Sequence, residues 1–280
     1  MKKSLLILAS IALLFAGCAK EKFAEGQKGG LQEVTFTANL ATEGTKAAVD
    51  GDGLYVNRCI MEIYFQDQLY KRMEAAMSGN PATATFSNVP VVAGKQYQIL
   101  FWADCGEEES LVDKYYTTNS DNKGLKAVSI KKSVFLETLK TGNNDKLEAF
   151  CHTDNFTVPQ GGGNYSATLK RPFAQVNVIT TDVGEGQSIR NADMLPENVC
   201  VSYTAANVIN VATGEVAGEE TYAYEAPVYG SWSTVTADHR ELTLSMDYIL
   251  ASKDKGTVDV TFKTKNDGAV VMDHNFTNLP

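Results

Sequence analysis

Val34-Thr-Phe-Thr-Ala-Asn-Leu40 places an apolar side chain at every second position, with polar residues between them. A period of two is typical of a β-strand with one buried face, because successive side chains of a strand point to opposite sides. The same period, and not the 3.6-residue period of a helix, returns along most of the chain. It predicts further strands at 58–65, 68–73, 82–86, 96–104, 156–158, 165–169, 173–180, 199–203, 208–211, 221–226, 242–249, 257–264 and 270–276.

Many short strands separated by turn residues predict an all-β protein. Helical pattern is confined to 133–140 and 145–150, each long enough for a turn or two. Gln66-Asp67 separates two of the predicted strands, which indicates a hairpin although its turn lacks glycine. A polar, glycine-containing stretch at 181–198 is the best candidate for a domain boundary. We therefore predict two antiparallel β-sandwiches in series, at 31–182 and 183–280.

The first seventeen residues have the features of a signal peptide. Lys2 and Lys3 precede an apolar run, 5–16, which is too short to span a bilayer as a helix. Phe15-Ala16-Gly17-Cys18 resembles a lipobox, in which small residues precede a cysteine that receives diacylglycerol. We predict that 1–17 is removed, that Cys18 is the lipidated N-terminus, and that 18–30 is a flexible tether. An ordinary secretory signal with an incidental cysteine is the alternative.

Charge and cysteine content restrict the partners and the chemistry. The formal net charge of −9 falls to −11 when Lys2 and Lys3 leave with the signal peptide, and an acidic protein is repelled by nucleic acid. Four further cysteines form no C-x-x-C pair; an even number permits disulfides in three connectivities. We favour free buried thiols, because Cys59 shares an alternating face with Met61 and Ile63. The four are Cys59, Cys105, Cys151 and Cys200.

The sequence contains no pattern that indicates catalysis. The three histidines, His152, His239 and His274, have no partner at the spacing of metal ligands. Neither a G-x-S-x-G nor a phosphate-binding G-x-x-x-x-G-K-[ST] motif occurs, and the glycines at 161–163 predict a loop because no helical pattern follows them. We therefore expect no enzyme, no metal and no cofactor. Trp232, beside Tyr229 in a loop-like region, is a candidate for stacking on a sugar.

Several longer stretches carry a family resemblance. They are Gly94-Lys-Gln-Tyr-Gln-Ile-Leu-Phe-Trp-Ala-Asp104, Leu169-Lys-Arg-Pro-Phe-Ala-Gln-Val-Asn-Val178 and Asn210-Val-Ala-Thr-Gly-Glu-Val216. With the lipoprotein start, they resemble the fimbrillin-like surface lipoproteins of Bacteroidia, the FimA/Mfa-type subunits of type V pili. The resemblance implies two transthyretin-like β-sandwich domains, a surface location on the outer membrane through the lipid anchor, and other pilin subunits as partners.

The resemblance also implies a mechanism of assembly. A trypsin-like protease cuts in the loop after the first strand, and a strand of the next subunit fills the vacated groove. Val34 to Leu40 would be the removable strand. Lys46 is the only basic residue between positions 29 and 57, so we expect cleavage between Lys46 and Ala47. Family members usually continue with a further strand or two, so this sequence is expected to be truncated or to lack the donor strand.

The sequence thus predicts a non-enzymatic cell-surface lipoprotein. It is a fimbrial subunit or fimbrillin-like adhesin that assembles by protease-triggered strand exchange, with a host protein or glycan as receptor. The alternative is an outer-membrane-anchored glycan-binding protein that does not polymerise and that uses Trp232 and Tyr229.

Overall fold

The structure is a computed structural model that describes residues 30–41, 53–131, 144–181, 195–235, 241–250 and 257–279. Within these ranges the regular structure is β-strand, apart from short 3-10 turns, and the predicted all-β fold is confirmed. Among the described residues, no helix has the length and apolar character needed to cross a membrane. The 3-10 turns are η1 (Ser120–Asn122), η2 (Gly124–Ala127), η4 (Asp145–Leu147) and η6 (Trp232–Thr234).

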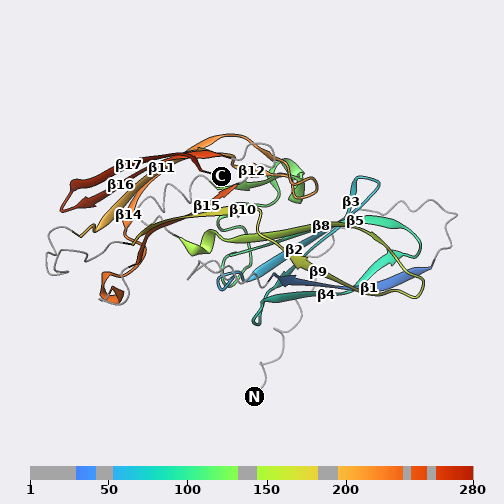
Figure 1. The fold of residues 1–280 in the computed structure, drawn as a ribbon. Helices are drawn as coiled ribbons and strands as arrows, with labels where there is room; N and C mark the ends of the chain where they lie inside the picture. Colours follow the sequence, from blue (N-terminus) through green and yellow to red (C-terminus); the bar gives the residue numbers. More distant parts are fainter. Residues whose placement is uncertain are drawn as a thin grey trace, which may run out of the picture.

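The first sandwich is built from two sheets that face one another across an apolar core (Figure 1). One sheet has the order β4 (Thr83–Val92), β1 (Leu31–Leu40), β9 (Gly163–Leu169). The other has the order β3 (Gln68–Ala76), β2 (Arg58–Phe65), β5 (Gln96–Asp104), β8 (Ala149–Thr157). Alternate residues of the strands fill the space between the sheets, among them the fully buried Phe36 and Phe101.

The predicted hairpin is present and joins β2 to β3. Its two turn residues, Gln66 and Asp67, have φ values of 49° and 62°. Two successive positive φ values are the signature of a type I′ turn, the geometry that suits a two-residue hairpin. The prediction for β8 was too short at its start, because this strand begins at Ala149 and replaces half of the expected helical turn. Much of its length is exposed and polar, which hides the alternation.

The second sandwich places a four-stranded sheet against a two-stranded one. The larger sheet has the order β14 (Glu220–Pro227), β11 (Asn198–Ala205), β16 (Val258–Asn266), β17 (Ala269–Leu279), and the smaller pairs β10 (Phe173–Thr180) with β15 (Leu242–Leu250). The domain boundary expected near residue 182 stays a prediction. Strand β10 lies before it, yet pairs with β15 from the second half, so the chain passes from the first sandwich to the second between the end of β9 and the start of β10.

A third apolar cluster joins the two sandwiches. Trp102 is fully buried there and packs edge-on against Tyr116, with ring centroids 5.2 Å apart. Strands β2 and β5 are consequently buried on both faces, which explains their long apolar runs. A small sheet lies at the same junction, in the order β13 (Val216–Ala217), β12 (Val208–Ile209), β7 (Val128–Ile130), β6 (Tyr116–Thr117).

Two buried charged side chains of β2, Arg58 and Glu62, contact the long connection after β5. Arg58 bonds Asp104 through Nε at 2.5 Å and Asp113 through Nη2 at 2.9 Å. The fully buried Glu62 accepts a bond from the Leu125 backbone N–H at 2.8 Å, and an added Cβ at Gly124 would overlap its carboxylate. Since a buried charge is costly unless it is paired, these contacts fix the path of the connection.

Candidate functional site

Strand β1 lies at the centre of its sheet, with β4 on one side and β9 on the other. Its four inward side chains are buried in the core, with exposed fractions of 0% for Val34, Phe36 and Ala38 and 5% for Leu40. The pairing with β4 is antiparallel, and the pairing with β9 is parallel. The sequence did not indicate the parallel pair, because the two strands lie far apart in the chain.

Phe36 is the centre of the contacts that β1 makes with the core. Its ring lies 5.6 Å from the ring of Phe156 and 5.7 Å from that of Tyr165, measured between centroids. Complete burial of a Val, Leu or Phe side chain contributes about 1.5–3 kcal/mol, and aromatic pairs add about 0.5–1.5 kcal/mol. The three large side chains of β1 therefore supply several kcal/mol to the stability of the first sandwich.

Polar contacts fix the register and the start of β1. The Asn39 amide donates to Ser166 Oγ on β9 at 3.1 Å and accepts from Thr83 Oγ1 on β4 at 3.1 Å. Gly162 lies against the backbone carbonyl of Glu33, where an added Cβ would overlap it. The glycines at 161–163 form a loop, as predicted. Gly162 allows this loop to close over the start of β1.

The sequence predicted lipidation at Cys18 and cleavage between Lys46 and Ala47. Cys18, Lys46 and Ala47 lie outside the described residues. Leu40 and Gly53 lie on either side of the segment that contains Lys46, and both are described. The Ala41 N–H donates to the carbonyl of Leu169 at 2.9 Å, which extends the pairing with β9 one residue past β1.

The two aromatic residues proposed for sugar stacking are both half-buried. Trp232 donates its indole N–H to the carbonyl of Pro196 at 2.8 Å and packs against the core of the second sandwich. Tyr229 packs against a different cluster, the one between the sandwiches. The structure therefore does not join the two rings into one platform, and sugar stacking stays a prediction.

All four cysteines in the described residues are free thiols, with Cys59 and Cys105 buried and Cys151 and Cys200 half-buried. Burial raises the pKa of the Cys59 thiol far above its ordinary value. A thiol held in its protonated form is a poor nucleophile, so the buried Cys59 behaves as a small apolar side chain.

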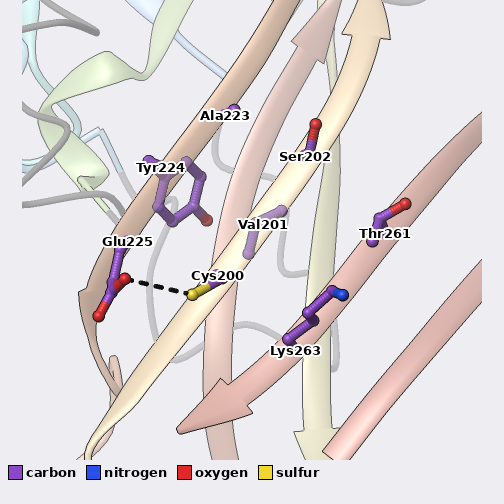
Figure 2. A pocket seen from close by; sticks show the side chains of 8 residues that line it. All are labelled: Cys200, Val201, Ser202, Ala223, Tyr224, Glu225, Thr261 and Lys263. Atoms are coloured by element: carbon purple, nitrogen blue, oxygen red, sulfur yellow. Dashed lines mark hydrogen bonds between the residues drawn. The ribbon is translucent and has the colours of Figure 1, made fainter. Parts of the chain in front are cut away.

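Figure 2 shows an open hollow of about 430 Å³ on the outer face of β14, β11 and β16. Cys200 and Glu225 point toward one another there, with 3.5 Å between Sγ and Oε2. Lys265 donates to the same carboxylate oxygen at 2.6 Å and lowers the pKa of Glu225. Burial raises the pKa of Cys200, which favours the protonated, less nucleophilic form of this thiol. Within the described ranges, no group of His, Cys, Asp and Glu side chains could hold a metal ion.

Comparison with solved structures finds several proteins that this chain resembles. A candidate polysaccharide-binding protein of Bacteroides thetaiotaomicron has a TM-score of 0.53 at 10% identity, over 86% of this chain and 79% of that chain. A candidate adhesin of Bacteroides ovatus has a TM-score of 0.51 at 15% identity, over 88% and 76%. The fimbrial anchor protein Mfa2 from Porphyromonas gingivalis has a TM-score of 0.48 at 14% identity, over 89% and 83%.

The first two likenesses show that the fold is shared with these two proteins of Bacteroides. No curated protein matches the sequence. One family model matches residues 26–280, which is nearly the whole chain after the predicted signal peptide. The chain therefore belongs to the family described as a family of unknown function, DUF6562.

Proposed function

We propose that this chain is a non-enzymatic cell-surface protein, a fimbrial subunit or fimbrillin-like adhesin, in which β1 is a replaceable strand. Cleavage between Lys46 and Ala47 would separate β1 from the rest of the sandwich. A strand of another subunit would then enter the groove between β4 and β9. Lipidated Cys18 would hold the uncut protein at the outer membrane.

The observation that carries this proposal is the central, buried position of the first strand. A strand between two neighbours uses the backbone N–H and C=O groups on both of its edges. Its removal would leave β4 and β9 with unpaired edges and would open the apolar groove that holds Val34 to Leu40. Such a sheet binds an extended segment strongly, by main-chain hydrogen bonds and alternate side-chain pockets.

Limited trypsin treatment of the full chain with Cys18→Ser tests the proposal. We expect a new N-terminus at Ala47, found by N-terminal sequencing, and loss of this product in Lys46→Gln. An unboiled denaturing gel then reports on assembly. A ladder of larger species supports strand exchange with the chain's own donor, and cleavage without a ladder supports a subunit that accepts a strand from a different protein.

A reversible lock on β1 separates strand exchange from other kinds of association. Thr37 on β1 lies opposite Thr85 on β4, and their neighbours Phe36 and Ala38 point into the core. A Thr37→Cys/Thr85→Cys disulfide would tie the strand in place, because opposite residues of an antiparallel pair are close enough to be bridged. The matched control is Thr261→Cys/Asn275→Cys, an opposite pair on β16 and β17.

The lock should block assembly of the trypsin-treated protein, and dithiothreitol should restore it, while the control disulfide has no effect. Assembly that continues with β1 locked would refute strand exchange at this groove. A chain that resists cleavage at Lys46 and stays monomeric would instead support the anchored adhesin or glycan-binding alternative, which retardation by polysaccharide in a native gel would then test.

A further inference from the structure

Three segments of the chain meet at the C-terminal end of β1. Leu40 is the last residue of the strand, and Gly53 lies directly against it after the intervening connection. A Cβ added at Gly53 would lie 2.5 Å from Leu40 Cδ1, and the φ of +77° also favours glycine. The third segment contains Glu148, which immediately precedes β8.

Glu148 ties these segments together through both carboxylate oxygens. Oε2 accepts the backbone N–H of Gly53 at 2.7 Å, and Oε1 lies 2.6 Å from Arg171 Nε. The carboxylate is buried, with a side-chain exposure of 2%. Arg171 follows β9 by two residues and lies over the Phe150 ring, 5.6 Å from its centroid. The pair therefore connects the chain that leaves β1 to the end of the parallel neighbour of β1.

Burial of the Glu148 carboxylate is energetically unfavourable unless its partners stay in place. Burial raises the pKa of Glu148 to about 7, while Arg171 and the Gly53 N–H act to lower it. A buried carboxylate with one partner removed is strongly unfavourable, so the three groups stay together or open together. Leu40 packs closely against Gly53, and Gly53 is held by its bond to Glu148.

We propose that Glu148 and Arg171 form a latch over the C-terminal end of β1, and that this latch limits how fast the strand leaves its groove. The inference rests on the proposed function, because it assigns a regulator to the departure of β1. It applies to the intact chain as well, in which the latch suppresses local opening of that strand.

Hydrogen–deuterium exchange of the full chain with Cys18→Ser measures local opening without any need for assembly. In Glu148→Leu the Gly53 N–H loses its acceptor, so we expect exchange of the β1 amides to accelerate by roughly tenfold relative to those of β5. Arg171→Met should act in the same direction. Glu148→Gln keeps an acceptor for Gly53 and should restore most of the protection. The effect of the double variant Glu148→Leu/Arg171→Met on β1 exchange should be smaller than the sum of the two single effects, because the two side chains act as one unit.

Glu62→Gln is the matched control. Glu62 is also a buried carboxylate paired with an arginine, Arg72 at 2.7 Å, but it holds the connection at Leu125 and not the end of β1. It should change β1 and β5 exchange equally. The latch would be overturned if Glu148→Leu changed the exchange rates of β1 and β5 amides by the same factor. It would also be overturned if Glu62→Gln accelerated the exchange of β1 selectively. Because exchange is read on the intact chain, a failed latch and a failed assembly experiment are separate results.

Discussion

Asp247 gives the sharpest prediction for the stability of the second sandwich. This aspartate of β15 is nearly inaccessible, with 8% of its surface exposed, and it accepts a hydrogen bond from the Tyr224 hydroxyl at 2.8 Å. Tyr203 is its second hydroxyl partner. Burial raises the pKa of Asp247 from 3.8 to about 7, against the opposing effect of both tyrosines. The carboxyl group is therefore protonated in the folded protein at pH values where it is ionised in the unfolded chain.

Because Asp247 is protonated to different extents in the folded and unfolded states, the free energy of unfolding depends on pH. Between pH 3.8 and about 7, the folded state binds a proton that the unfolded state has released. The free energy of unfolding therefore falls as pH rises through this interval. A pKa raised from 3.8 to about 7 corresponds to roughly 4 kcal/mol at pH 8. In Asp247→Asn the side chain is neutral at every pH, so this part of the pH dependence should vanish.

Urea unfolding of the full chain, followed by tryptophan fluorescence from pH 5 to pH 8, measures the effect. Wild type should lose more stability over this interval than Asp247→Asn, by a few kcal/mol. Glu225→Gln, on the outer face of the same sandwich, is the control and should keep the wild-type slope. Equal slopes for wild type and Asp247→Asn would refute the reasoning, since the burial of Asp247 would then carry no linked proton.

Three further predictions concern single side chains. Phe36→Ala should cost about 3–5 kcal/mol in urea unfolding, because it empties the centre of the β1 contacts. Gly124→Ala should lower the melting temperature much more than Gly94→Ala. Both glycines have positive φ, but only at Gly124 would the added Cβ meet a buried carboxylate, and a calorimetric scan of the two variants compares them directly. A thiol reagent should label Cys200 in the native protein and Cys59 only after unfolding, which mass spectrometry of the labelled peptides checks.

The sequence predicted most strands because most of them have at least one face in a core. The strand at 96–104 was predicted with the bounds that the structure shows, and the strand at 173–180 likewise. Alternation is a local property, so it can be read without knowledge of the neighbours. Pairing is not local, and nothing in Val34 to Leu40 indicates that β9 would lie beside it in parallel. Much of β8 was missed because its polar, exposed positions hide the period of two.

The polar contacts around the candidate site could not be predicted either, because they join residues that are distant in the sequence. Glu148 lay in a segment that favoured a short helical turn, and its partners Gly53 and Arg171 come from distant parts of the chain. Only the fold brings the three together. The glycines at 161–163 were a usable signal, since they predicted a loop, but the sequence did not show that this loop closes over the start of β1.

A strand that is both a core element and replaceable presents an energetic problem. The contacts of Phe36 and its neighbours are worth several kcal/mol, and an incoming strand with the same alternation would regain them. The middle of β1 therefore contributes little to the free-energy difference between the protein before strand exchange and the protein after it. Its contacts contribute mainly to the barrier, along with those at the ends, where Gly162 covers Glu33 and Gly53 covers Leu40. Since a strand begins to open at its ends, the Glu148–Arg171 pair at the C-terminal end of β1 is where a small change would alter the rate and leave the final stability nearly unchanged.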